Sequence, residues 1–176
     1  MDEIKEAILK YALRYGSFRL AHLRLESPIK IEVDRILADP KFTRVITLDI
    51  LKFFGKDISS IGGVATGGIH WAARVADYMS TPEFCIQKDG NVSGAISGNL
   101  VGIIEDVVTT GESLDNAVNI VKKKGVLPKT LSIFNYGFRE DIPALVYFKD
   151  IREDIAPYYR DEVNEWYDRA RKDLIS

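Results

Sequence analysis

The 176-residue sequence has little cysteine, little histidine and no long apolar run, and each shortage excludes a class of protein. Its one cysteine, Cys85, excludes an intrachain disulfide, so we expect a reducing compartment, the cytoplasm. No apolar run approaches the ~18 residues of a membrane span, and the N-terminus "MDEIKEAILKYALRYG" lacks the charge order of a signal peptide. With one cysteine and two histidines, a protein-built metal centre is not expected.

The sequence also lacks an excess of charge of either sign. The formal net charge of −2 gives no global attraction to nucleic acid or to an anionic membrane, so we expect neither as a partner and any anion site must be local. Hydrophobic residues make up 46% of the chain and charged residues 28%, as in ordinary globular proteins. The length predicts a single domain over residues 1–176, able to bury a core without disulfides.

Strand, glycine loop and helix alternate through the middle of the chain. The patterns predict strands over 57–64, 82–88, 100–106 and 130–138, and helices over 2–15, 39–54, 69–79, 113–124 and 161–175. Residues 17–37 alternate well enough for a strand or hairpin, and residues 89–99 are expected to form a loop. Asp39 is expected to cap its helix, with Pro40 in the first turn. Parallel strands need long crossovers, so this order predicts an α/β fold with helices on both faces of a parallel sheet.

Two adjacent acids, Glu105 and Asp106, end an apolar strand and precede the loop "VVTTGES". Ligands of open α/β sheets bind beyond the carboxyl ends of the strands. The helix that begins here presents free N–H groups and a positive dipole end, which favour a phosphate. A phosphate would repel the acids, whereas a sugar diol would donate hydrogen bonds to them. The stretch therefore predicts a ribose 5-phosphate site; the alternative is a strand end with solvated acids and Thr109 as a helix N-cap.

The full string "LVGIIEDVVTTGESL" resembles the phosphoribosyl-pyrophosphate motif of type I phosphoribosyltransferases. "GGVATGGIHWAARVADYM" looks like the family's earlier glycine loop, which receives the pyrophosphate. "FRLAHLRLESPIKIEVDRIL" is similar to the N-terminal hood of orotate phosphoribosyltransferases, and "SIFNYGF" and "EWYDRARKDL" resemble one subgroup of them. The likeness spans nearly the whole chain and implies the type I fold, with a small hood formed by about residues 1–37.

The resemblance implies that orotate attacks C1 of phosphoribosyl pyrophosphate, giving orotidine 5′-monophosphate and pyrophosphate. Mg²⁺ would be bound mainly by the substrate, with Glu105 and Asp106 in its coordination shell. The resemblance also implies that Asp106 is a catalytic residue. The other implied substrate-binding residues are Val107 and Val108, Thr109 at the base, Thr110, Gly111, Glu112 and Ser113 at the 5-phosphate, and Ala65, Thr66, Gly67 and Gly68 at the pyrophosphate. A homodimer is expected, because orotate enzymes are usually dimers.

The sequence departs from the family in the mobile lid. Orotate enzymes usually carry Lys-x-x-x-Lys-x-His-Gly there, whereas this chain has "QKDGNVSGAISGN" over 87–99. Lys88 is the only cation in this shorter segment and is therefore the candidate catalytic cation. A neutral hydrogen bond from the lid's hydroxyls or amides is worth about half a charge-assisted one.

The base-reading cations also differ from the family pattern. Ala21 and His22 stand where the hood usually has a lysine, and Asn135–Tyr136 replaces the arginine that often binds the orotate carboxylate. Arg24 and Arg139 are nearby candidates for that task, and each is equally well read as a solvated surface residue.

Three functions remain open on the sequence. The first is an orotate phosphoribosyltransferase with a reduced lid, favoured by the hood and by "SIFNYGF". The second is a phosphoribosyltransferase for another base. The third is a non-catalytic regulator that binds phosphoribosyl pyrophosphate, favoured by the missing lid cations.

Overall fold

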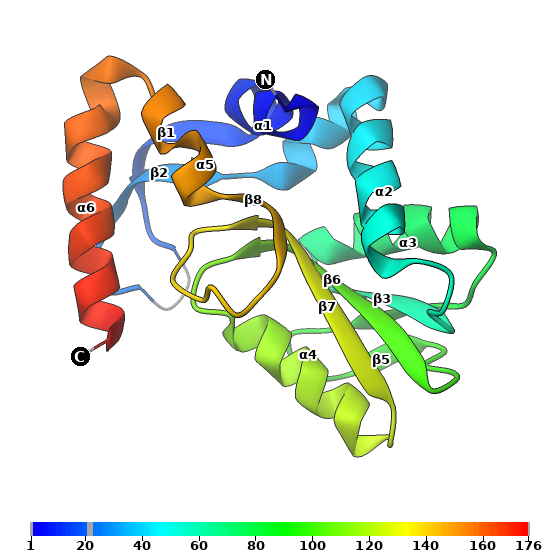
Figure 1. Cartoon of the computed structure of the whole chain (residues 1–176). Coiled ribbons are helices and arrows are strands. Elements are labelled where there is room, and N and C mark those ends of the chain that lie inside the picture. Colours follow the sequence, from blue (N-terminus) through cyan, green and yellow to red (C-terminus); the bar gives the residue numbers. More distant parts are fainter. Residues whose placement is uncertain (1, 21–22, 176) are drawn as a thin grey trace.

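The computed structural model describes residues 2–20 and 23–175, and their centre is a six-stranded sheet with the order β5-β4-β3-β6-β7-β8 (Figure 1). Its strands are β3 (Ser60–Val64), β4 (Glu83–Ile86), β5 (Val92–Gly94), β6 (Leu100–Val108), β7 (Leu127–Asn135) and β8 (Ala144–Tyr147). Neighbouring strands are parallel except β5, which is antiparallel to β4. The predicted α/β fold with a central parallel sheet is confirmed.

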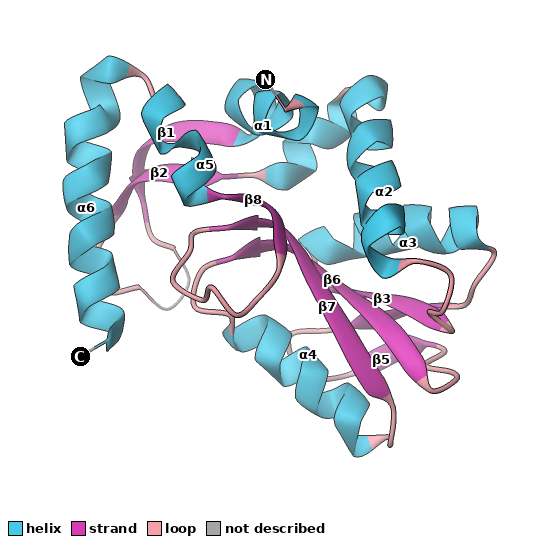
Figure 2. Ribbon diagram, in the orientation of Figure 1, coloured by secondary structure: helices cyan, strands magenta, loops and turns pink. Residues whose placement is uncertain are grey.

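Helices cover both faces of this sheet. α2 (Pro40–Phe54) and α3 (Gly67–Met79) lie on one face and α4 (Glu112–Lys123) lies on the other (Figure 2). Successive strand residues point to opposite faces, so neighbouring residues of β6 enter different cores. Ile104 joins the core that contains α2 and α3, whereas Ile103 joins the core that contains α4, and both are fully buried.

The start of α2 forms as the sequence predicts. Asp39 accepts hydrogen bonds from the backbone N–H groups of Lys41 at 2.9 Å and Phe42 at 3.4 Å. Pro40, which has no N–H to satisfy, occupies the first turn. Local chemistry is enough to set this boundary.

The hood begins differently from the prediction. It contains α1 (Glu3–Ala7), the π-helix η1 (Ile8–Ala12), the antiparallel strands β1 (Leu13–Phe18) and β2 (Ser27–Ile31), and the 3-10 helix η2 (Val33–Ala38). The helix expected over 2–15 therefore ends at Ala12, because Leu13 pairs with Ile31 of β2 instead of continuing the helix. The hairpin expected over 17–37 is right in its second strand and wrong in its first.

The sequence prediction also missed short elements in the second half. The loop expected over 89–99 contains β5, whose three residues pair with β4 and place Gly94 opposite Phe84. Strand β8, helix α5 (Phe148–Ile151) and the 3-10 helix η3 (Arg152–Asp154) were not anticipated, and α6 (Pro157–Ile175) begins four residues before the expected helix at 161–175. Three- and four-residue elements are too short for a period to be read.

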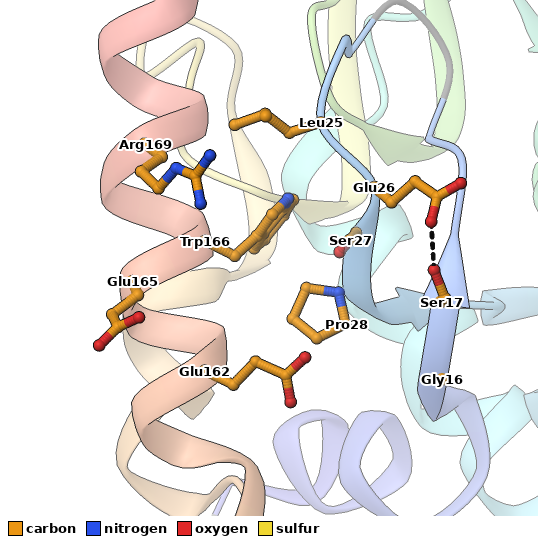
Figure 3. Close-up of a pocket in the computed structure, with 10 residues that line it drawn as sticks. All are labelled: Gly16, Ser17, Leu25, Glu26, Ser27, Pro28, Glu162, Glu165, Trp166 and Arg169. Carbon is orange, nitrogen blue, oxygen red and sulfur yellow. Dashed lines mark hydrogen bonds between the residues drawn. The ribbon is translucent and has the colours of Figure 1, made fainter.

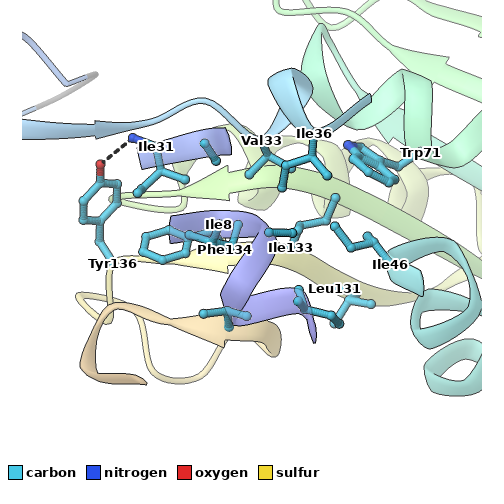
Figure 4. Packing of buried hydrophobic residues seen from close by; sticks show 14 of the residues in the cluster. Ile8, Ile31, Val33, Ile36, Ile46, Trp71, Leu131, Ile133, Phe134 and Tyr136 are labelled. Atoms are coloured by element: carbon cyan, nitrogen blue, oxygen red, sulfur yellow. Dashed lines mark hydrogen bonds between the residues drawn. The ribbon is translucent and has the colours of Figure 1, made fainter. Parts of the chain in front are cut away.

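The hood and the sheet share one continuous apolar core (Figure 4). At the hood's outer side, Tyr15 stacks on Tyr159 of α6 with ring centroids 4.4 Å apart, and its hydroxyl accepts a hydrogen bond from the N–H of Ala156 at 2.9 Å. At its inner side, the hydroxyl of Tyr136, directly after β7, accepts a hydrogen bond from the N–H of Ile31 at 3.2 Å. The hood is therefore fixed over the ends of the central strands. Within residues 2–20 and 23–175, no helix combines the length and apolar character needed to cross a membrane.

Candidate active site

The acid pair lies at the carboxyl end of β6. Glu105 is only 7% exposed, whereas Asp106 is half-buried. The backbone N–H of Asp106 donates to Oε1 of Glu105 at 3.1 Å. Burial raises the pKa of the Glu105 carboxyl well above its ordinary value, and the side chain of Asp106 raises it further through its own hydrogen bond and its charge. The backbone N–H of Asp106 and the charge of Lys88 lower this pKa by smaller amounts. The pair therefore favours a ligand that brings hydroxyl donors or positive charge.

The glycine loop, residues 65–68 between β3 and α3, lies directly against these acids. A Cβ on Gly67 would be 2.0 Å from Oδ2 of Asp106. A Cβ on Gly68 would be 2.3 Å from the carbonyl oxygen of Ile104. Because only glycine permits so close an approach to the backbone of Ile104, the loop expected to receive pyrophosphate and the acids expected to hold the sugar adjoin.

The expected phosphate cradle is the turn of residues 109–113 between β6 and α4. Gly111 has a φ of +81°, in the left-handed region that favours glycine. Helix α4 begins one residue later, so its first N–H groups, which have no partner within the helix, face the turn. A small cavity of about 50 Å³ is lined by Glu105 and residues 107–114. This is the arrangement that favours a bound phosphate.

Arg139 supports the cradle from outside. Its guanidinium forms ion pairs with Asp115 at 2.7 Å and Asp141 at 2.8 Å and donates to the carbonyl oxygen of Thr110 at 3.3 Å. The hydrogen bonds to Asp141 and then Asp115 raise the pKa of Arg139 further above its usual range. The contacts of Arg139 are thus those of a residue that fixes the turn, not those of a free cation awaiting a base.

A larger cavity of about 430 Å³ joins the acid pair, the glycine loop and the hood. Its lining comprises Lys30, Ile31, Glu32, Asp34, Ala65, Thr66, Gly67, Lys88, Glu105, Asp106, Val107 and Ser113. The structure thus brings eight predicted residues to one cavity, and Glu105, Val107 and Ser113 also line the small cradle cavity.

Four residues from the hood were missed by the sequence reading. Lys30, Glu32 and Asp34 line the main cavity together with Ile31. A signal for the three charged residues exists, because they alternate with the apolar Ile29, Ile31 and Val33. A period of two that places apolar side chains in the core also places the charged ones on the opposite side.

Lys88 is the candidate that the short lid brings to the site. It is exposed in the turn after β4 and lines the main cavity. The rest of the lid folds back through β5 onto β4, with Val92 opposite Ile86. The 87–99 segment is therefore part of the sheet edge and not a long free loop in this structure.

The remaining candidate cations lie elsewhere. Arg24 is exposed in the connection between β1 and β2, and it lines neither the main cavity nor the cradle. Ala21 and His22 lie outside the described residues. His70 is exposed on α3, and its carbonyl oxygen accepts a hydrogen bond from Arg74 at 3.1 Å. In the described part of the chain, no group of three or more histidine, cysteine or acidic side chains is placed to hold a metal ion.

A second cavity of about 290 Å³ lies between the hood and α6 (Figure 3). Glu26, Glu162, Glu165 and Arg169 are the charged residues of its lining, and Figure 3 shows the α6 side chains across from the hood strands. It shares no residue with the main cavity.

The fold and this site define a type I phosphoribosyltransferase. A solved orotate phosphoribosyltransferase from Aeropyrum pernix superposes with a TM-score of 0.75 at 25% identity, over 86% of this chain and 98% of that one. Curated orotate phosphoribosyltransferases include that of Methanocorpusculum labreanum, 31% identical over 72% of this chain and 78% of that protein. The chain belongs to the orotate phosphoribosyltransferase family.

Another curated relative matches over a smaller share of both chains. The orotate phosphoribosyltransferase of Pyrobaculum islandicum is 32% identical over 124 residues, and the match spans 64% of this chain and 63% of that protein. No protein-family model matches the chain.

Proposed function

We propose that this protein transfers the phosphoribosyl group of 5-phosphoribosyl 1-pyrophosphate to orotate. The observation that carries the proposal is the convergence of the acid pair, glycine loop and hood on one cavity of about 430 Å³, beside a helix N-terminus that suits a phosphate. The names of the curated relatives support orotate as the accepting base.

Each part of the cavity has one task. The N–H groups and hydroxyls of residues 110–113 hold the 5-phosphate, while Glu105 and Asp106 accept hydrogen bonds from the ribose hydroxyls. The glycine loop, residues 65–68, receives the pyrophosphate and Lys88 neutralises part of its charge. Thr109, beside the cradle, contacts the base.

The bond between C1 and the pyrophosphate oxygen breaks as the bond from the orotate ring nitrogen to C1 forms, and the proton of that nitrogen passes to the leaving pyrophosphate. Pyrophosphate leaves with the electron pair, so negative charge grows beside Lys88 and the glycine loop. Preorganised donors at the point where charge develops lower the barrier most effectively. The hood covers the cavity and limits the access of water, and no side-chain nucleophile is needed.

Mg²⁺ is part of this proposal. The carboxylate oxygens of Glu105 and Asp106 suit this ion, which commonly binds through one or two carboxylates together with substrate phosphates. When bound, Mg²⁺ would neutralise part of the pyrophosphate charge. The proposal also includes a homodimer and a location in the cytoplasm. The cytoplasmic location is supported by Cys85, a buried thiol whose pKa is raised by burial.

Pyrophosphate release tests the proposal directly. The purified protein with Mg²⁺ and phosphoribosyl pyrophosphate is given orotate, uracil, adenine or guanine in separate reactions. Release only with orotate supports the proposal, and release only with another base replaces orotate by that base. Binding of phosphoribosyl pyrophosphate without release for any base would instead identify a regulatory binding protein.

A further inference from the structure

Orotate carries a carboxylate that stays ionised near neutral pH, and a binding site for it requires a cation. Arg139 is the cation nearest to the expected position in sequence, but its guanidinium is committed to Asp115, Asp141 and the carbonyl of Thr110. To reach the base, the guanidinium would have to break both ion pairs and its hydrogen bond to Thr110 in the cradle. The carboxylate must therefore find another partner.

Two cations among the described residues line the main cavity, Lys30 and Lys88. Lys88 follows β4, whose last residue, Ile86, pairs with Val64, the residue before the glycine loop. The charge of Lys88 also lowers the pKa of the Glu105 carboxyl by a small amount. It therefore lies on the pyrophosphate and sugar side of the cavity.

Lys30 lies on the other wall. It belongs to β2 of the hood, where it pairs with Arg14 of β1. Its neighbour Ile31 is held by the hydrogen bond from its N–H to the Tyr136 hydroxyl, which fixes the strand against the sheet (Figure 4). The position of Lys30 is thus set by a rigid element and not by a loop.

The ammonium of Lys30 forms an ion pair with a neighbouring acid, Glu32. Its Nζ lies 3.0 Å from Oε1 of Glu32, and the side chain is 43% exposed. Arg35 lies 3.7 Å from the other oxygen of Glu32. If Lys30 turns to a ligand, Glu32 keeps a cationic partner, so the exchange leaves no carboxylate without one.

We propose that Lys30 binds the carboxylate of the base and so makes the site prefer orotate over uracil. This inference rests on the proposed function and names the residue that sets its base specificity. Lys30 takes over a task for which the chain has no free arginine within the described residues that line the cavity.

The ratio of two dissociation constants tests this role. Orotidine 5′-monophosphate and uridine 5′-monophosphate differ only in the carboxylate, and calorimetry measures the affinity of each for wild type, Lys30→Met and Lys30→Arg. Loss of one charge-assisted hydrogen bond predicts that Lys30→Met binds orotidine 5′-monophosphate about 10- to 100-fold more weakly. Its affinity for uridine 5′-monophosphate should stay unchanged, and Lys30→Arg should restore most of the preference.

Lys52→Met is the matched control, because Lys52 also pairs with a nearby acid, Asp49, but lies on α2 away from the cavity. It should leave both constants unchanged. An undiminished preference in Lys30→Met, or an equal loss for both nucleotides, would overturn the inference. Failure of wild type to release pyrophosphate with orotate would instead overturn the proposed function, so the two failures are distinguishable. Should Lys30→Met not fold, Lys30→Gln replaces it in the same measurement.

Discussion

The hydroxyl of Tyr136 offers a sharp test of how the hood is held over the site. Tyr136 is fully buried, and its hydroxyl accepts the hydrogen bond from the N–H of Ile31, which is itself buried. Tyr136→Phe keeps the ring and its packing but leaves this N–H without its partner. An unsatisfied buried donor costs about 1–3 kcal/mol. For a domain of this size, each kcal/mol lowers the melting temperature by roughly 2–4 °C, so we expect a fall of about 2–12 °C.

Thermal unfolding followed by circular dichroism measures this fall. Tyr158→Phe is the control, because Tyr158 is 89% exposed and the same atom is removed there. Amide exchange should report the same change locally, with faster exchange at Ile31 in Tyr136→Phe alone. Equal melting temperatures for the two variants, with unchanged exchange at Ile31, would refute the claim that this hydrogen bond fixes the hood.

Three further predictions concern the cavity itself. Asp106→Asn should weaken phosphoribosyl pyrophosphate binding about 10- to 100-fold by calorimetry, since an acceptor for the sugar is lost; unchanged binding would reject that contact. Lys88→Met should lower kcat at least about tenfold with little change in KM for orotate, because its charge acts on the leaving pyrophosphate; an unchanged kcat would make Lys88 a scaffold residue. Glu105 has a raised pKa in the folded state, so the stability it contributes is present below its ordinary pKa of 4.5 and is lost as pH rises through the raised value. Glu105→Gln should therefore gain stability relative to wild type as pH rises above 4.5, and a pH-independent difference in chemical denaturation would contradict this.

Asp77→Asn is the control for Asp106→Asn and Glu105→Gln. Asp77 is exposed near the end of α3 and lines neither cavity of the site. It should leave both ligand binding and the pH dependence of stability as in wild type.

The sequence predicted the elements whose signals are local. An apolar run, two acids and a hydroxyl-rich turn before an amphipathic segment are enough to place β6, the cradle and α4. The cap of α2 at Asp39 is likewise a matter of adjacent residues. These features need no information from distant parts of the chain.

The features that escaped prediction depend on distant partners. Leu13 leaves the helical path because a strand 18 residues later pairs with it, as its register with Ile31 shows. On the sequence alone Arg139 is a candidate for the base, but in the structure its guanidinium is paired with Asp115, 24 residues earlier. The alternation of Lys30 with apolar neighbours is visible in the sequence, but the cavity that Lys30 lines is formed by segments far along the chain.

A crystal structure with ribose 5-phosphate and Mg²⁺ tests the central claim most directly. The account predicts the phosphate against the backbone N–H groups of residues 110–113, with the ribose hydroxyls within hydrogen-bonding distance of Glu105 or Asp106. A ligand bound in the groove between the hood and α6, or a sugar that leaves both acids untouched, would contradict it.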